Sequence, residues 1–328
     1  SASPRPTYCS ECVPPGRRSL ARPETAAMPR TPAPLSRRRF LQYSAAATAA
    51  LSAPQMFAAE ADPYGGFKMG LQSYTLRAFD ARTALEHTRK LGLHYWEAFP
   101  NHVPLSTLPQ NVREQRALLK EYDVSLIGYG VVSFSDDETK ARETFDFAKA
   151  MGLLAISANP KKNAATFDLL DKLVDEYDVP VAIQNHGHVA DYDKAQYVVD
   201  FVKDRHPKIG ACVDTGHYLR SDEDPVEVIR TLGKRVFGVH LKDVRTIRDA
   251  AELAKLERSL PANRVRQLKA EGKIFTILGE GELDVAGCLK ELRKLGYDRC
   301  LSLEYEENEQ NPLSDIEVSL QCVRDAVK

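Results

Sequence analysis

The sequence predicts a (β/α)8 barrel, known as a TIM barrel, built as one domain. Eight short apolar runs rich in β-forming residues occur after residue 62, and segments with apolar residues at three- and four-residue spacing lie between them. Regular alternation of strands and helices is typical of a parallel sheet. Eight such units in about 265 residues also match the usual length of this barrel.

The eight expected strands follow one another through the chain. Several of the segments between them end in Gly, a common helix stop. A doubly wound open sheet is the alternative, but it normally carries a Gly-rich phosphate turn after its first strand, and none is found here. The strand runs are FKMGLQSY (67–74), YWEAF (95–99), VSLIGYG (124–130), LLAISAN (153–159), VPVAIQNH (179–186), IGACVDTG (209–216), RVFGVHLKD (235–243) and RCLSLEYEE (299–307).

One connection is longer than the rest. More than 50 residues separate HLKD, which ends at 243, from LSLEYE, which begins at 301. The stretch 277–297 is the helical segment expected before strand eight. The charged helical stretch 248–272 is extra, so we expect an inserted excursion on the loop side of the barrel that covers the site as a lid.

The first 61 residues predict a leader outside the barrel, which then spans 62–328. Ser36–Gln42 (SRRRFLQ) matches the twin-arginine export pattern, an Ala-rich apolar stretch follows, and AEA at 59–61 offers a cleavage site. The apolar stretch is too short and too weakly hydrophobic for a stable membrane anchor. We therefore expect a disordered or cleaved leader and a periplasmic protein; a disordered basic tail is the alternative. Residues 1–27 precede Met28, as they would if the start codon were placed too early.

Charge is distributed unevenly between the leader and the body. The chain holds 45 basic and 46 acidic residues, but the leader takes eight Arg and three Glu, which leaves 37 basic and 43 acidic residues in 62–328. An acidic body is a poor match for a polyanion, so nucleic acid is excluded as the expected partner. Self-association is left open.

The cysteines predict neither a zinc finger nor a disulfide framework. Cys9 and Cys12 fall in the leader, and the body has no C-x-x-C pair. The remaining four stand in apolar contexts and are expected to be buried thiols, although an exported protein permits disulfides. They are Cys212, Cys288, Cys300 and Cys322.

Polar side chains stand at the ends of strands five to eight. Their first polar residues are Gln184, Asp214, His240 and Glu304, and in a barrel of this kind the carboxyl ends of the strands carry the chemistry. Three of the four have a structural alternative: Asp214 as a turn former or helix cap, His240 as a core histidine and Glu304 as a solvent-facing residue. Four in succession indicate one shared divalent metal ion, such as Mn²⁺, Mg²⁺, Co²⁺ or Zn²⁺.

The segments VAIQNHG, CVDTGH, GVHLKD, LGEGELD and LSLEYE, in this order and spacing, resemble the xylose isomerase-like TIM-barrel family of sugar isomerases, sugar epimerases and inosose dehydratases. The resemblance extends from about Phe67 to the end of the chain. The departure is Gln184, where the epimerases use a glutamate as one of two acid–base groups. The resemblance implies metal ligands at Gln184, Asp214, His240 and Glu304, a substrate contact at His217, and Glu97 and His102 at the mouth of the same site.

The chemistry common to such a family is proton abstraction next to a carbonyl. Glu304 is the best candidate base, and His186 and His188 are the next candidates. Lys242 is expected to neutralise a developing oxyanion. An amide cannot accept a proton, so Gln184 favours a reaction that needs a base on one face of the substrate only.

Three functions follow as hypotheses. The first is a metal-dependent sugar isomerase or epimerase. The second is a lyase or dehydratase that eliminates across a keto-sugar or a 3-keto-glycoside. The third is a non-catalytic carbohydrate-binding protein. The expected export signal favours an unphosphorylated small-molecule sugar or glycoside. A related activity, cleavage of DNA at abasic sites with several zinc ions, is disfavoured by the acidic body and by the lack of extra His and Glu ligands.

Overall fold

The structure, a computed structural model, describes residues 62–188 and 190–328. The expected leader with its twin-arginine motif and cleavage site lies outside the described residues, so export and the boundary at residue 62 stay predictions. Across the described part of the chain, no helix is long and apolar enough to cross a bilayer.

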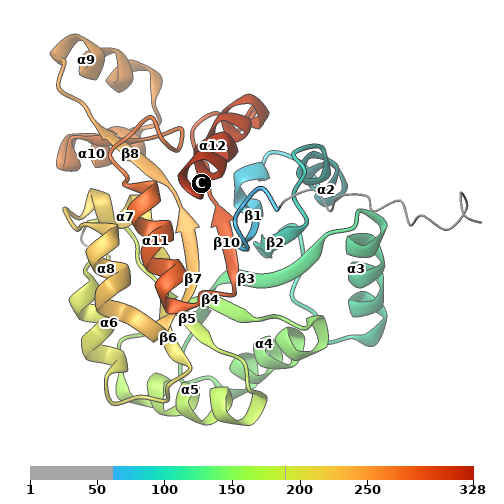
Figure 1. Cartoon of the computed structure of the whole chain (residues 1–328). Helices are drawn as coiled ribbons and strands as arrows, with labels where there is room; N and C mark the ends of the chain where they lie inside the picture. The colour runs from blue at the N-terminus through green and yellow to red at the C-terminus, as the bar shows by residue number, and fades with distance from the viewer. Residues whose placement is uncertain (1–61, 189) are drawn as a thin grey trace, which may run out of the picture. The chain divides into compact units, whose positions relative to one another are not determined.

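Within the described residues, eight parallel strands close into the predicted barrel (Figure 1). Each overlaps one of the eight apolar runs, and the last strand pairs with the first, Lys68 against Cys300, to close the ring. The doubly wound alternative is therefore wrong. Around the ring the strands are β1 (Lys68–Gln72), β2 (Tyr95–Ala98), β3 (Ser125–Phe134), β4 (Ala155–Pro160), β5 (Val181–Gln184), β6 (Ile209–Asp214), β7 (Val236–Leu241) and β10 (Cys300–Leu303).

Helices follow the strands and begin at side-chain caps. Asp80, Asp137 and Asn163 each accept a backbone N–H at the start of a helix. Gly152 ends one helix in the left-handed region, at φ 76°. Short 3₁₀ turns cover Ser73–Leu76 and Gly233–Arg235. The helices outside the excursion are α2 (Ala81–Lys90), α3 (Pro109–Glu121), α4 (Glu138–Met151), α5 (Ala164–Tyr177), α6 (Ala195–Val202), α7 (Thr215–Arg220), α8 (Pro225–Leu232), α11 (Val285–Leu295) and α12 (Leu313–Ala326).

The core explains why the strands are continuous apolar runs. Leu71, Ile183, Val239 and Leu301, on four different strands, are all fully buried. A parallel strand in such a barrel is buried on both faces, so it has no polar face to alternate with. Trp96 is also fully buried, and its Nε1 donates to a threonine hydroxyl 2.8 Å away, which satisfies its polar end.

The body cysteines are free thiols within the described residues, as the sequence predicts. Three are buried and Cys322 is partly buried. Burial raises the pKa of the Cys212 and Cys288 thiols, so these side chains are neutral parts of the core.

The excursion between β7 and β10 forms as predicted but is built from two helices. They are α9 (Ala250–Ser259) and α10 (Ala262–Glu271), and Pro261 separates them. An antiparallel ribbon that the sequence analysis did not predict carries them: β8 (Asp243–Thr246) pairs with β9 (Lys273–Thr276). In Figure 1 α10 lies next to β8, and α9 lies farther out from the strand ends.

Asp243, the last residue of HLKD, fastens the chain that returns from the excursion. This carboxylate is almost fully buried. Its Oδ1 accepts the N–H groups of Glu282 and Leu283 at 2.9 Å each, and its Oδ2 accepts those of Gly279 and Gly281 at 3.0 and 3.1 Å. A Cβ at Gly281 would collide with the carboxylate, so glycine is required there. The motif pair HLKD and LGEGELD is thus one structural unit.

Replacing Asp243 by Asn is expected to lower the free energy of unfolding by about 2 to 4 kcal/mol, because an NH₂ group would then face N–H donors. Urea unfolding followed by circular dichroism measures this. Asp249→Asn is the matched control: Asp249 caps the exposed start of α9, and Asn is an equally good cap, so we expect a change under about 0.5 kcal/mol. Equal losses in the two variants would contradict the role given to Asp243.

Candidate functional site

A cavity of about 410 Å³ opens at the carboxyl ends of the strands, a size typical of small-molecule sites. Half of the ten residues singled out from the sequence line it: Gln184, His186, His217, Lys242 and Glu304. The cavity therefore lies where the barrel fold places active sites.

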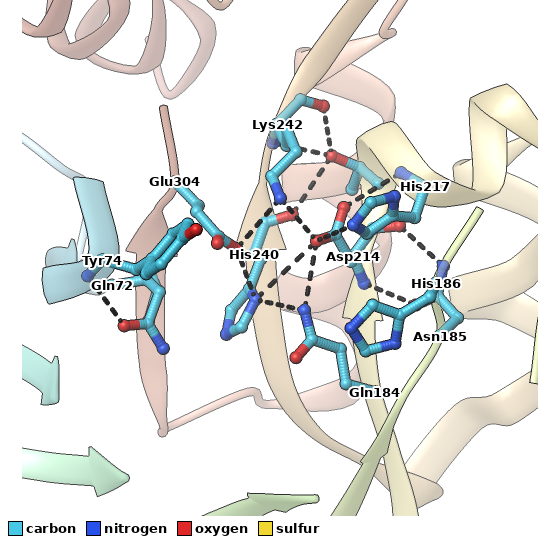
Figure 2. A network of polar contacts seen from close by, with 12 residues as sticks. Gln72, Tyr74, Gln184, Asn185, His186, Asp214, His217, His240, Lys242 and Glu304 are labelled. Carbon is cyan, nitrogen blue, oxygen red and sulfur yellow. Dashed lines mark hydrogen bonds and ion pairs between the residues drawn. The ribbon is translucent and has the colours of Figure 1, made fainter. Parts of the chain in front are cut away.

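Asp214, His240 and Glu304 meet beneath the cavity (Figure 2). One potential ligand atom from each lies within 4.8 Å of the others. His240 Nδ1 is 2.9 Å from Glu304 Oε2 and 3.9 Å from Asp214 Oδ2. The three come from β6, β7 and the residue after β10, which are neighbours in the ring. Successive strand ends thus bring together residues that are far apart in sequence.

Asp214 serves two purposes because its two oxygens face different ways. Oδ1 accepts the backbone N–H of His217 at 3.0 Å and caps α7, while Oδ2 faces His240 and Lys242. Asn185 fixes the strand end, since its Oδ1 accepts the Asp214 N–H at 2.8 Å and its Nδ2 donates to the Asp214 carbonyl at 3.0 Å. The helix-cap alternative is correct and does not exclude a site role.

Glu97 lies below His240 and does not line the cavity. Its Oε2 is 2.9 Å from His240 Nε2 and accepts the Ser302 hydroxyl at 2.9 Å. Burial alone would lower the pKa of His240, but the carboxylates of Glu97 and Glu304 outweigh it and raise that pKa. Glu97 therefore orients the imidazole so that Nδ1 faces the cavity, as a carboxylate does behind many metal-bound histidines.

Gln184 reaches the same cluster from β5. Its Nε2 lies 3.1 Å from His240 Nδ1 and donates to Asp214 Oδ2 at 3.3 Å. Its Oε1 is buried and accepts no hydrogen bond from any described residue. Gln184 thus presents its NH₂ group, and not its oxygen, to the cluster, and a role as a metal ligand would require the amide to turn by half a rotation.

Lys242 is held among carboxylates. Its Nζ lies 3.1 Å from Asp214 Oδ2, 3.2 Å from Glu304 Oε2 and 2.6 Å from Glu306 Oε1. Burial would lower the pKa of Lys242, but these three anions outweigh it and raise that pKa. The lysine is therefore a fixed positive charge that balances the site carboxylates, with its three donors directed at them.

His217 has a defined tautomer because Arg220 donates to it. Arg220 Nη1 lies 2.8 Å from His217 Nδ1, and a guanidinium can only donate, so the imidazole proton is on Nε2. Burial lowers the pKa of His217 to about 3, which keeps the ring neutral. Nε2 lies 3.7 Å from Asp214 Oδ2.

Arg220 also binds the excursion. It pairs with Glu271 of α10 through two contacts of 2.6 and 2.7 Å, and the two side chains are 4% and 5% exposed. Its guanidinium lies against Gly187, where a Cβ would overlap it. The glycine of the HGH sequence is therefore needed for this contact.

The excursion lines the cavity, as the lid hypothesis predicts. Arg264 and Gln267 of α10 and Phe275 of β9 all face the cavity. The Phe275 ring lies 5.1 Å from the Arg220 guanidinium, 5.0 Å from Lys242 Nζ and 5.2 Å from the Arg264 guanidinium. The aromatic ring thus holds three cationic side chains at one wall.

The other three histidines that the sequence predicts for the site, His102, His186 and His188, lie in different places. His186 lines the cavity 5.3 Å from the His217 ring, and burial lowers its pKa. His188 lines an adjoining groove, with 56% of its side chain exposed. His102 does not line the cavity: its Nε2 lies 3.0 Å from the Phe79 carbonyl and its ring stacks on Trp96. The structure thus brings His186 to the reaction cavity and places the other two elsewhere.

Several cavity residues were not identified from the sequence. No pattern in the sequence singles out Arg220, which ends a short helix, and Tyr74 lies in the 3₁₀ turn after β1. The predicted lid could have indicated Arg264 and Gln267, because a helix that covers a site directs one face at it. The lining residues missed by sequence reasoning are Gln72, Tyr74, Phe99, Pro100, Gly130, Val131, Arg220, Arg264, Gln267, Phe275 and Glu306.

The donor set fits a divalent cation. It comprises one imidazole nitrogen, two carboxylates and an amide oxygen, which suit a borderline-to-hard ion. Gln184 Oε1 and Glu304 Oε2 are buried and accept no hydrogen bond within the described residues, although Glu304 Oε2 lies within ion-pair distance of His240 and Lys242. Glu304 Oε2 therefore already has cationic partners, and Gln184 Oε1 is the buried acceptor that still lacks a donor or a cation.

Comparison with known proteins gives a family match over most of the chain. The family model described as xylose isomerase-like TIM barrel matches residues 85–326. Among solved structures, an uncharacterised protein from Parabacteroides distasonis superposes with a TM-score of 0.55 and 26% identity, over 78% of this chain and 97% of that one. A zinc-bound IolI protein superposes with a TM-score of 0.59 and 16% identity, over 80% and 98%, and this likeness concerns the fold alone.

Curated relatives match over shorter stretches. An inosose dehydratase from Clostridium botulinum is 31% identical over 102 residues, which is 30% of this chain and 32% of that protein. The rhizopine catabolism protein MocC from Rhizobium meliloti is 32% identical over 154 residues, 45% of this chain and 43% of that protein. The chain thus matches less than half of the length of these relatives.

Glu271→Ala is expected to lower the free energy of unfolding by about 3 to 5 kcal/mol, or to unfold the excursion alone, because Arg220 would be left buried without its counter-ion. Urea unfolding and limited proteolysis across 248–272 measure the two effects. Glu257→Ala is the control, since Glu257 pairs only at the surface of the excursion, 3.3 Å from Lys269, and exposed pairs contribute under about 1 kcal/mol. Unchanged stability and protection in Glu271→Ala would show that the pair does not fasten the excursion.

Proposed function

The chain belongs to the xylose isomerase-like TIM-barrel family, and from this premise we propose that it is a carbohydrate enzyme that binds one divalent metal ion and removes a proton next to a carbonyl. The relatives named inosose dehydratase support this class. Within it, we favour a lyase that eliminates across a keto-sugar. An isomerase or epimerase is the second candidate.

The lyase is favoured over an epimerase because the site residues are asymmetric around the ring of strands. Glu304 lines the cavity from the β10 side, whereas β5 presents the amide of Gln184. Epimerisation by two carboxylates requires a base on each face of the substrate, and an amide cannot accept a proton. A reaction that uses one base on one face fits this arrangement.

Elimination needs only that one base. Glu304 takes the proton from the carbon next to the ketone, and the C–O bond on the following carbon breaks. The electron pair of that bond leaves with the oxygen, and the proton held by Glu304 passes to it. The products are an unsaturated ketone and water or an alcohol, so atoms and charge balance without a further reactant.

The metal ion would be held by Asp214, His240 and Glu304, with Gln184 Oε1 as a fourth, weaker ligand. When bound, the ion supplies positive charge that polarises the substrate carbonyl. With two carboxylates around it, the ion is less neutralised than with three, so its pull on a bound oxygen is stronger. Glu97 keeps His240 Nδ1 directed at the cluster.

The cavity favours a substrate without phosphate. Its arginines are already balanced: Arg220 pairs with Glu271, and Arg264 pairs with Glu307. Lys242 is balanced by Glu306 and the site carboxylates. The expected twin-arginine leader favours the same substrate class, because phosphorylated sugars are cytosolic.

His186 is the observation in favour of the second candidate. It lines the cavity, and burial lowers its pKa, so the ring is a neutral imidazole that can accept a proton. If His186 replaces the base that Gln184 lacks, epimerisation becomes available. Transfer of a proton between neighbouring carbons by Glu304 alone would give aldose–ketose isomerisation.

Asp214→Asn is expected to abolish metal binding and activity while the fold persists. Asn still caps α7, but the substitution removes one of the anionic ligands. Loss of a residue that only supports a ligand lowers metal affinity by about tenfold to hundredfold, so loss of the ligand itself should lower it further. Elemental analysis measures the bound metal, and circular dichroism shows whether the fold persists. Asp224→Asn is the control, because Asp224 caps α8 away from the site. Full metal content in Asp214→Asn would overturn the ligand assignment.

Gln184→Glu is expected to raise metal affinity by about tenfold or more, since it adds a third anionic ligand, and to add epimerase activity by supplying the second base. Chelator competition measures the affinity. Turnover of keto-sugars in D₂O separates the reactions: elimination gives an unsaturated ketone, whereas epimerisation gives a deuterated epimer. Epimer formed by the wild type and lost in His186→Ala would favour the second candidate. If Gln184→Glu changes neither the metal affinity nor the reaction products, Gln184 does not belong to the site.

A further inference from the structure

A second cavity of about 540 Å³ adjoins the reaction cavity. The two share His186, His217, Arg220 and Gln267, so they are neighbouring chambers on either side of these side chains. The second chamber continues between the turn after β5, at His188, and α10. A disaccharide that reaches past these four side chains would place one sugar ring in each chamber.

We propose that this second chamber is a subsite for the sugar residue that departs during elimination, so that the substrates are keto-glycosides of two or more sugar residues. The inference rests on the proposed function and names its substrate class. In a keto-glycoside with the ketone two carbons from the glycosidic carbon, the bond that breaks joins two sugar rings. The departing half then needs a place of its own beside Glu304 and His217.

The chamber wall is one face of α10. Asn263, Arg266, Gln267 and Ala270 are spaced by three and four residues, so they lie on the same side of the helix. Ala270 leaves room at the end of this face, and the amide and guanidinium groups supply donors suited to sugar hydroxyls. The same helix directs Arg264 at the reaction cavity, so one inserted element builds both walls.

Arg266 supplies the chamber with a donor that is available to a ligand, because it forms no ion pair with any described residue. The His188 side chain is 56% exposed, and its Nδ1 lies 4.0 Å from Asp193 Oδ2. Arg220 and Arg264 differ, because both are neutralised by glutamates. Arg220 is thus a paired donor at the boundary of both chambers, whereas Arg266 is an unpaired donor that lines the second chamber alone.

The test compares two substrates that differ only in the departing group: a 3-keto-disaccharide and the methyl 3-keto-glycoside of the same sugar. Arg266→Ala and Asn263→Ala are each expected to lower kcat/KM for the disaccharide by about tenfold and for the methyl glycoside by less than about twofold. Arg258→Ala is the matched control, because Arg258 is an exposed arginine of α9 that does not line the chamber. It should change neither value.

Ala270→Trp fills the chamber and is expected to remove turnover of the disaccharide selectively. Equal losses for both substrates in the α10 variants, or full disaccharide turnover by Ala270→Trp, would overturn the proposal. Calorimetric titration of the metal-loaded protein with the unoxidised disaccharide and methyl glycoside separates this inference from the proposed function. One outcome supports the subsite and contradicts the lyase: neither keto-substrate turns over, the disaccharide binds about tenfold more tightly than the methyl glycoside, and Arg266→Ala removes that preference. Equal binding of the two sugars contradicts the subsite.

Discussion

The balance of buried charge at the strand ends is the constraint on which the rest of the site depends. Asp214, Glu304 and Glu97 are carboxylates inside an apolar barrel, and each would be destabilising there without a positive partner. His240 and Lys242 supply those partners from a single strand and its end, two residues apart. Once these two side chains are fixed, the orientations of the carboxylates follow, and so does the direction in which the open face of the cluster points.

The strands and the ring of site residues could be predicted because both depend on local sequence. Strands buried on both faces are continuous apolar runs, and in a closed barrel the ends of successive runs meet at one rim. This is why Asp214, His240 and Glu304 could be expected to converge. The resemblance implied Glu97 at the mouth, and the sequence could not correct this, because a strand end indicates a position along the barrel axis but not the direction of a side chain. It belongs to β2 itself and points into the interior, where it supports His240.

Contacts between distant segments could not be predicted in this way. Arg220 and Glu271 are 51 residues apart, and neither shows a pattern that indicates its partner. The ribbon of β8 and β9 was not predicted for a related reason: its strands are only four residues long each, and two helices separate them in the sequence. Hydrophobic periodicity identifies which face of an element is buried. It carries no information about which polar side chains on two elements will meet, because that depends on the packed arrangement.

The fastening of the excursion by Asp243 bears on how such proteins diversify. Both ends of the inserted segment leave and rejoin the barrel at one clamp, where a single carboxylate accepts several backbone N–H groups. Changes of length or sequence in α9, which has no buried residue, are therefore tolerated by the barrel, because loop closure depends only weakly on the number of residues in the loop. The outer helix can vary, whereas α10 is tied to the barrel through the pairs Glu271–Arg220 and Arg264–Glu307 and has to be kept with the catalytic floor.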